Sequence, residues 1–279
     1  MLTERVAHWE WMLCKRRAQL ANAIGRPFTY RHRLLGRFVY HPSDDLSRRV
    51  LLYDFEESEL RFAIRHAQRG GTILDVGANI GVFTVACARA ALGVGQVIAL
   101  EPSPATFAKL RVTCARLGLQ NVELLQIAAA DENGQARFVA AGIHELRQHL
   151  ADARADGSGA IQVEARRLDD VFRDRVADVT LLKIDVEGHE VQVLSGASRI
   201  LANGRVHLIV EVNPHALEAA SASVAALRQL LSRTHECTTI IRQDGTSEVD
   251  GSNFIVRPPH EMFNTLWAPL GPVVPPRLC

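Results

Sequence analysis

Short apolar runs alternate with stretches of helical periodicity from about residue 71 onward. The runs are GTILDVG, GQVIALE, NVELLQIAA, VTLLKID and VHLIVEV, followed by CTTIIR and SNFIVR. Helices are expected between most of them, at 80–92, 104–117, 168–176, 188–203 and 215–233. Because β-branched strands that alternate with helices are buried on both faces, the pattern predicts an α/β fold around a parallel sheet. The last two runs are joined across QDGTSEVDG without a helix, which predicts an antiparallel pair at one edge.

Residues 138–167 interrupt this alternation. The runs RFVA and IQVEARRL are expected to pair as strands around a polar, turn-rich loop, as an insertion on the rim of the sheet. Such rim insertions commonly select substrates. The main domain is expected to span residues 51–260, before a Pro-rich tail at 261–279 that ends in an irregular segment, APLGPVVPPRLC.

The first fifty residues form a basic extension, with ten basic and four acidic side chains. Residues 1–25 carry an apolar stripe at helical spacing, formed by Leu2, Val6, Trp9, Leu13, Leu20 and Ile24. We expect this helix to pack on the main domain or on a partner subunit, which would make a homo-oligomer. Attachment to a membrane surface is the alternative, and the acidic Glu4 and Glu10 weaken it.

Composition narrows the class of protein. Lys and Arg number 32 against 31 Asp and Glu, so no net field attracts nucleic acid or an anionic membrane. The N-terminal apolar residues are too interrupted for a secretory signal, and no run of about eighteen apolar residues could span a bilayer. The five cysteines are scattered without CxxC spacing, which indicates neither a disulfide framework nor a zinc site. A soluble cytoplasmic protein is the default expectation.

The segment TILDVGANIGVFT places glycines where the first strand of this pattern meets its helix. Gly77 and Gly81 permit a tight turn and the close approach of a ligand to backbone N–H groups. Their spacing differs from the GxGxxG pattern that binds a pyrophosphate. Asp75, two residues before Gly77, would repel a phosphate and attract an amino group or another cation.

The next two strands end in further candidates. Glu101 follows the second strand, where an acid can accept hydrogen bonds from both hydroxyls of a ribose; a carboxylate exposed to water is the alternative. In IAAADENG, three small residues that include Ala129 leave room for a flat ring, and Asp131 could meet the edge of a base. Asp131 could equally form an ordinary turn.

The segment LLKIDVEGHE runs a buried strand into four titratable groups, Asp185, Glu187, His189 and Glu190. Ligands of open parallel sheets bind beyond the carboxyl ends of the strands, and the acids named above end three other strands of the same sheet. A rim of four acids excludes an anionic ligand. It suits a nucleoside that carries a cationic sulfonium and an amino group, whereas NAD and ATP suit it badly.

In these segments the sequence resembles the FkbM family of class I S-adenosylmethionine (SAM) methyltransferases. The resemblance rests on ILDVGANIGVFT, ALEPSP, RRLDDV, LLKIDVEGHEVQVLSGA and LIVEVNP, in family order over roughly residues 50–257. It implies a Rossmann-like fold with a seven-stranded, mostly parallel sheet, an antiparallel edge strand and helices on both faces. It also implies SAM as the cofactor and O-methylation of a small molecule or glycan that offers a free hydroxyl.

The segment that contains Gly77 and Gly81 is here called the glycine loop. Carried over by position, the resemblance implies that Asp75, Gly77, Asn79 and Gly81 in and beside this loop meet the methionine portion of SAM, and that Glu101 meets its ribose. Asp185 would face the methionine amino group or the acceptor. The full set of expected cofactor residues is Asp75, Gly77, Ala78, Asn79, Gly81, Glu101, Pro102, Ser103, Ala129, Asp131 and Asp185.

Methyl transfer requires an acceptor oxygen aligned at about 3–3.5 Å from the methyl carbon, and a base within hydrogen-bond reach assists it. The expected catalytic residues are Asp185, Glu187, Glu211 and His189. Glu187 and Glu190 lie three apart at the expected start of a helix, on one face, where an acid is also stabilised by the helix N-terminus. Lys183 is expected to form a structural ion pair with one of these acids. Because the sequence shows no clear third ligand beside Asp185 and Glu211, a metal-free site is expected.

Three alternatives stay open. VNPH superficially resembles the Asn-Pro motif of nucleic-acid methyltransferases, but it follows the fifth strand and lacks an aromatic residue to stack on a base, so nucleic acid is not the expected partner. An NAD-dependent oxidoreductase is disfavoured by Asp75 and by the glycine spacing. A non-catalytic SAM-binding protein would retain all of the cofactor positions.

Overall fold

The computed structural model describes residues 2–53, 55–140, 148–150, 160–242, 247–248 and 261–270, of which residues 2–11, 139–140, 148–150 and 248 are described by their backbone alone. The polar loop of the expected rim insertion and the QDGTSEVDG connection lie mostly outside these ranges, and the SNFIVR run lies wholly outside them.

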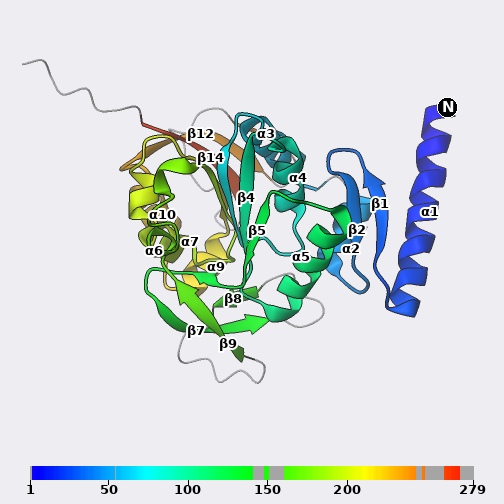
Figure 1. Ribbon diagram of the computed structural model, residues 1–279, viewed down its shortest axis with the longest axis horizontal. Helices are drawn as coiled ribbons and strands as arrows, with labels where there is room; N and C mark the ends of the chain where they lie inside the picture. Colours follow the sequence, from blue (N-terminus) through cyan, green and yellow to red (C-terminus); the bar gives the residue numbers. More distant parts are fainter. Residues whose placement is uncertain are drawn as a thin grey trace, which may run out of the picture.

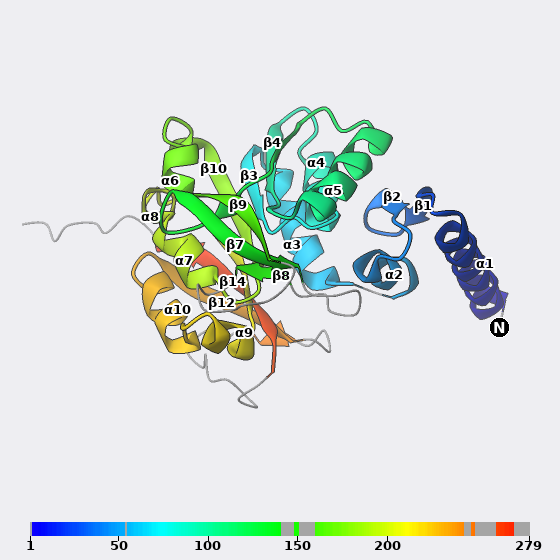
Figure 2. The same cartoon turned by 90° about the horizontal axis from the view of Figure 1, so that it is seen from below.

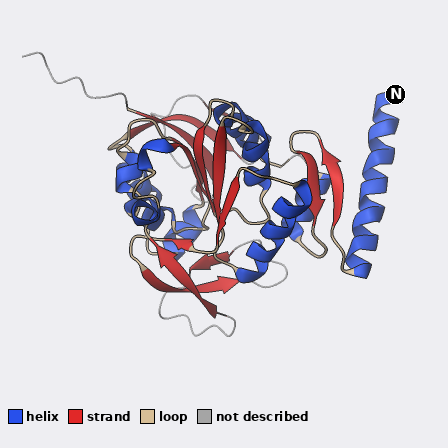
Figure 3. Cartoon of the chain, in the orientation of Figure 1, coloured by secondary structure: helices blue, strands red, loops and turns tan. Residues whose placement is uncertain are grey.

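The centre of the molecule is a mostly parallel sheet between two layers of helices (Figures 1 and 3). Its strands follow the order β5-β4-β3-β10-β11-β14-β12, and the short β13 pairs with the outer side of β12. The strands are β3 (Gly71–Val76), β4 (Gly95–Leu100), β5 (Val122–Leu125), β10 (Val179–Ile184), β11 (His207–Val212), β12 (His235–Arg242), β13 (Ser247–Glu248) and β14 (Phe263–Pro269). Neighbours from β5 to β11 run parallel, whereas β14 is antiparallel to both β11 and β12. The predicted seven-stranded α/β sheet is confirmed.

The antiparallel strand β14 comes from a later part of the chain than expected. It begins at Phe263, beyond residue 260, where the sequence analysis ended the domain. Leu266 and Trp267 are buried in the sheet layer, and the Trp267 indole N–H donates a hydrogen bond of 2.9 Å to the Thr265 hydroxyl. The sequence analysis did not predict this strand of seven residues, because prolines surround it. The sheet therefore continues to Pro269.

Helices cover both faces of the sheet because neighbouring strand residues point to opposite sides (Figure 2). Ile73 of β3 packs with the helices of one face, whereas Leu74 and Val76 pack with those of the other. The first group includes α3 (Glu57–Ala67) and α4 (Val82–Ala90), with α5 (Pro104–Leu117) packed beside β4. The second group comprises α6 (Leu168–Val171), α7 (Glu190–Ser195), α8 (Ser198–Leu201), α9 (Pro214–Ala219) and α10 (Val224–Leu231), with a 3₁₀ turn at Val176–Asp178.

A second, smaller sheet adjoins the pocket described below. It has the order β6-β9-β7-β8 and consists of β6 (Ala128–Ala129), β7 (Gly134–Ala140), β8 (Gln148–Leu150) and β9 (Ala160–Arg166). β7 and β9 are antiparallel, with Phe138 opposite Ile161, which confirms the predicted pairing of RFVA with IQVEARRL. The side chain of Phe138 is buried and reaches the pocket.

The N-terminal segment lies at the periphery, where α1 (Leu2–Ile24) runs beside the hairpin of β1 (Phe28–His32) and β2 (Gly36–Tyr40) and near α2 (Asp45–Leu52) (Figure 1). The helix packs on the domain through Ala18 and Ala21, which are buried. The described part of the predicted apolar stripe is exposed: Leu13, Leu20 and Ile24 are 59%, 62% and 57% exposed. Within the described residues, no helix is both long and apolar enough to cross a membrane.

Candidate cofactor and acceptor site

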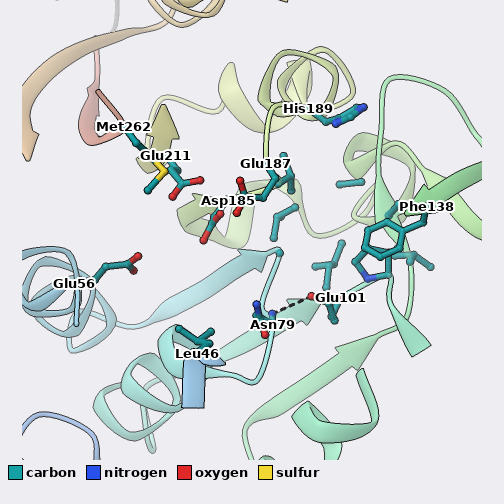
Figure 4. A pocket seen from close by; sticks show the side chains of 18 of the residues that line it. Leu46, Glu56, Asn79, Glu101, Phe138, Asp185, Glu187, His189, Glu211 and Met262 are labelled. Carbon is teal, nitrogen blue, oxygen red and sulfur yellow. Dashed lines mark hydrogen bonds between the residues drawn. The ribbon is translucent and has the colours of Figure 1, made fainter. Parts of the chain in front are cut away.

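A cavity of about 300 Å³ lies beyond the carboxyl ends of β3, β4, β10 and β11 (Figure 4). One end has an apolar wall, which includes Leu100, Ile127, Ala128, Ala129 and Phe138. At the opposite end, Glu211 and Met262 face Glu56 across the cavity in Figure 4. The pocket therefore has one surface for an apolar, flat group and one surface rich in carboxylates.

The glycine loop joins the two halves of this pocket. Gly77 has a φ of +77°, and a Cβ at this position would overlap the carbonyl oxygen of Asp185. The N–H groups of Gly77 and Ala78 both donate to the carbonyl of Leu100 at 3.0 Å, and the N–H of Asp185 donates to Val76 at 3.1 Å. Glycine is required here because the loop passes in direct backbone contact with the end of β10.

Glu101 is held at the end of β4 by the backbone. Its side chain is only 4% exposed, and its two oxygens accept hydrogen bonds from the N–H groups of Asn79 (3.0 Å) and Ser103 (2.9 Å). Burial raises the pKa of Glu101 to about 7, against the lowering effect of these two donors. Each oxygen keeps a lone pair for a further donor, such as a ribose hydroxyl.

Several predicted cofactor residues lie outside the cavity wall. Asp75 is buried beneath the glycine loop, where it accepts a hydrogen bond of 2.6 Å from the Thr84 hydroxyl of α4. Asp131 is exposed at the turn that precedes β7. Three more predicted residues lie outside the wall. Ala78 packs against α5, and Gly81 faces Leu110. Ser103 caps α5, because its hydroxyl accepts a hydrogen bond from the N–H of Thr106. The predicted residues that do line the cavity are Gly77, Asn79, Glu101, Pro102, Ala129, Asp185, Glu187, His189 and Glu211.

Asp185, Glu187 and Glu211, here called the carboxylate cluster, come together at the ends of β10 and β11. One carboxylate oxygen from each lies within 4.8 Å of those of the other two. Figure 4 shows the three side chains turned toward the same part of the cavity, with the ring of His189 pointing away from them. The sequence pattern thus located this cluster, although only the fold could show how close its members are.

The expectation that Glu187 and Glu190 share one helix face is wrong, because α7 begins only at Glu190. Glu187 lies in the preceding turn with a φ of +50°, which directs its side chain into the cavity. Glu190 is fully buried and folds back to accept hydrogen bonds from the N–H groups of Gly188 (3.0 Å) and Val186 (3.4 Å). Glu190 therefore shapes the turn that presents Glu187.

Lys183 forms the predicted structural ion pair. Its ammonium group lies 3.2 Å from Oδ2 of Asp185 and 3.6 Å from Oδ1 of Asp75, and it donates to the carbonyl of Gly77 at 3.1 Å. Burial alone would lower the pKa of Lys183, but the carboxylates of Asp185, Asp75 and Glu56 more than offset that effect and raise it. The lysine is therefore charged and fixes the glycine loop to the end of β10.

The cavity also contains acids that the sequence analysis did not identify or could not rank. Glu56 precedes α3 with a left-handed φ of +44°, and burial together with the charge of Asp185 raises its pKa to about 8. Glu211 is 8% exposed, and burial followed by the charges of Asp185 and Glu187 raises its pKa well above the ordinary value. The acidic segment YDFEESEL was a signal for Glu56, but its backbone conformation was not readable from the sequence.

Taken together, the sheet order and the pocket define an α/β protein with a cavity at the strand ends, in which the buried Glu101 keeps lone pairs for further donors and a carboxylate cluster faces the far end. These features fit SAM, because its ribose is a neutral donor, its base is flat and its sulfonium and ammonium groups are cationic.

Comparison with known proteins identifies the family. The model described as the methyltransferase FkbM domain matches residues 75–240, more than half of the chain. The chain belongs to the FkbM methyltransferase family, whose cofactor is SAM, as predicted from the sequence.

Two curated relatives and one solved structure are similar to the chain. The 31-O-demethyl-FK506 methyltransferase FkbM of Streptomyces tacrolimicus is 31% identical over 66% of this chain and 80% of its own length. The hexuronic acid methyltransferase AglP of Haloferax volcanii is 27% identical over 57% of this chain and 62% of its own length. The chain therefore spans about three fifths of the length of AglP. A crystal structure of a methyltransferase FkbM from Methylobacillus flagellatus aligns with a TM-score of 0.44 at 13% identity, over 79% of this chain and 52% of that one.

Proposed function

We propose that this protein transfers the methyl group of SAM to a hydroxyl oxygen of a glycan or a secondary metabolite. The observation that carries the proposal is the position of the carboxylate cluster, which faces the cavity on the side opposite the apolar wall. The names of two relatives support a hydroxylated acceptor, since one methylates a hexuronic acid and the other acts on 31-O-demethyl-FK506.

The Glu101 end of the pocket would hold the nucleoside part of SAM. Glu101 would accept hydrogen bonds from the ribose, while the apolar wall that contains Ala129 and Phe138 would cover the base. The backbone from Gly77 to Asn79 would meet the methionine portion, with Asp185 facing its ammonium group. When bound, SAM supplies an electrophilic methyl group on its sulfonium, so the protein's main task is alignment.

The acceptor would enter beside Glu211. A second cavity, of about 510 Å³, adjoins the first and shares Arg49, Phe55, Glu56, Glu211 and Met262 with it. An acceptor held there would bring its hydroxyl to the carboxylate cluster, where a carboxylate with a raised pKa can take the hydroxyl proton. Positioning of the hydroxyl and removal of its proton are thus assigned to the same group of side chains.

Nucleic acid is not the proposed acceptor. Asn213 of the VNPH segment is 2% exposed, and its side-chain oxygen caps α9 by accepting a hydrogen bond of 3.2 Å from the N–H of Ala216. This asparagine is therefore committed to the fold and lies outside the cavity wall.

The experiment that tests the proposal has two stages. Calorimetric titration of the purified chain with SAM and with S-adenosylhomocysteine should show saturable binding of both. Transfer of a labelled methyl group should then be assayed against uronic acids, neutral sugars and hydroxylated polyketides, with an RNA as the comparison. Labelling of an RNA but of no hydroxylated small molecule or glycan would overturn the proposed acceptor class. Absence of binding to both nucleosides would overturn the proposed function itself.

A further inference from the structure

The carboxylate cluster has the composition and spacing of a site for a hard cation. Its three oxygens, one each from Asp185, Glu187 and Glu211, lie within 4.8 Å of one another. They come from the ends of two neighbouring strands and from the turn after β10, in which Glu187 is left-handed and the buried Glu190 accepts a hydrogen bond from the N–H of Gly188. Carboxylate oxygens converging in this way are the ligands that Mg²⁺ and Mn²⁺ take in proteins.

Glu211 supplies a second, separate observation. Glu211 is 8% exposed, and Figure 4 shows its side chain directed into the cavity. Its side chain is hydrogen-bonded to Asp185 within the cluster, whereas its Oε2 accepts no hydrogen bond from the described residues. A buried carboxylate oxygen without a donor is costly, and a bound cation is one of the ways in which proteins compensate it. Glu101, by contrast, has a backbone N–H donor for each of its two oxygens.

Among the described residues, two cations lie near the cluster. Lys183 contacts Oδ2 of Asp185 at 3.2 Å, which leaves the second oxygen of that carboxylate. Arg49 also lines the cavity, but its guanidinium lies over the ring of Phe55, 5.3 Å from the centroid. The cavity wall near the cluster also carries Glu56, a fourth carboxyl group beside the three of the cluster.

We propose that Asp185, Glu187 and Glu211 bind a divalent cation, Mg²⁺ or Mn²⁺, and that this cation presents the acceptor hydroxyl to the methyl donor. This inference rests on the proposed function. Three protein oxygens leave open positions on an octahedral cation, and an acceptor with two adjacent oxygens, such as a vicinal diol or a hydroxy acid, would fill two of them. The metal-free expectation drawn from the sequence lacked a third ligand, and Glu187 supplies it.

The test uses the full chain and Mn²⁺ alone as the probe. Binding is measured by the loss of the electron paramagnetic resonance signal of free Mn²⁺, without and with saturating S-adenosylhomocysteine. We expect one saturable site in both conditions, and at least tenfold weaker binding in each of Glu187→Gln and Glu211→Gln. Glu218→Gln is the matched control, because Glu218 is exposed on α9 and should leave the affinity unchanged. The two glutamine variants are nearly isosteric, and their folding is verified by thermal melts.

Three results would overturn the cation site: no saturable Mn²⁺ binding, equal affinity in the wild type and both cluster variants, or loss of Mn²⁺ binding when S-adenosylhomocysteine saturates the protein. The last result would mean that the ammonium group of the cofactor fills the cluster. A parallel titration with S-adenosylhomocysteine in EDTA separates the two proposals, because nucleoside binding that survives without Mn²⁺ binding removes the cation and keeps the proposed function. Absence of nucleoside binding removes the proposed function.

Discussion

The buried carboxylates at the two ends of the pocket have different surroundings. At the Glu101 end, each of the two oxygens accepts a hydrogen bond from a backbone N–H group, that of Asn79 or that of Ser103. At the other end, the members of the carboxylate cluster face one another, and burial with mutual repulsion raises the pKa of Glu211. The proposed function assigns a neutral hydroxyl donor to the first end and positive charge to the second.

Two neighbouring glutamates after β10 also differ in their surroundings. Glu190 accepts hydrogen bonds from Gly188 and Val186 and is sealed from solvent, while Glu187 is turned into the cavity. Of two identical side chains three positions apart, one thus shapes the turn and the other lines the cavity. What distinguishes them is the backbone conformation, which is left-handed at Glu187.

The largest effect on stability and on cofactor affinity is expected from a substitution of Gly77, which lies in the loop that joins the two ends of the pocket. In Gly77→Ala the new methyl group would overlap the carbonyl of Asp185, on a backbone with a φ of +77°. We expect the free energy of unfolding to fall by more than about 3 kcal/mol, measured by urea denaturation, and the affinity for S-adenosylhomocysteine to fall with it. Gly134→Ala is the control, since a Cβ at that exposed position meets no atom within 4 Å. Wild-type stability in Gly77→Ala would contradict the backbone contact.

The second prediction concerns the Glu101 end of the pocket alone. Glu101→Ala removes the acceptor for a ribose and leaves the N–H groups of Asn79 and Ser103 without their partner. Loss of hydrogen bonds to a charged group should weaken the binding of both SAM and S-adenosylhomocysteine by roughly 10- to 100-fold, as measured by calorimetry. Glu132→Ala, an exposed acid outside the cavity, serves as the comparison. Unchanged affinity in Glu101→Ala would leave Glu101 as a purely structural residue.

The strand-end positions of the site could be predicted from the sequence because the carboxyl ends of parallel strands meet at one edge. Apolar periodicity located the ends of β4 and β10, and therefore Glu101 and Asp185. The burial of Asp75 was also implicit, since residues 73 and 75 share one face of β3 and that face is covered by α4. The sequence analysis placed Asp75 at the rim because it considered the end of the strand without its alternation.

Other parts of the site depend on information that the sequence does not display. Glu56 and Glu187 face the cavity through left-handed backbone conformations at residues other than glycine, which tertiary contacts impose. Phe138 and Met262 arrive from segments distant in the chain, one in the small sheet and one just before β14. Both side chains line the cavity because these segments fold over the strand ends, and no local sequence pattern predicts that position.

The third prediction concerns how the stability of the protein depends on pH through the acids at the carboxylate-rich end of the pocket. Burial raises the pKa of Glu56 to about 8 and that of Glu211 above its ordinary value, so the folded state keeps protons that the unfolded chain has already released. The free energy of unfolding should therefore fall as the pH rises from about 7 to 8.5, by on the order of 1 kcal/mol. The histidines with a lowered pKa, His41 and His66, act in the opposite direction but below this range, at a folded pKa of about 4.

Glu211→Gln should flatten this pH dependence, because the variant has no charge to bury at that position. Urea denaturation of the metal-free protein at several pH values measures it, with Glu218→Gln expected to follow the wild type. Equal slopes in Glu211→Gln and the wild type would show that the raised pKa of Glu211 does not contribute to stability.

The smallest effect is expected at Asp131, where the sequence analysis placed a contact with the base. Its side chain is exposed at a turn and does not line the cavity, so we expect it to contribute little to cofactor binding. Asp131→Ala should leave the affinity for S-adenosylhomocysteine within about twofold and the free energy of unfolding within about 0.5 kcal/mol. A tenfold loss in calorimetry would show that the turn before β7 closes over the base when the cofactor binds.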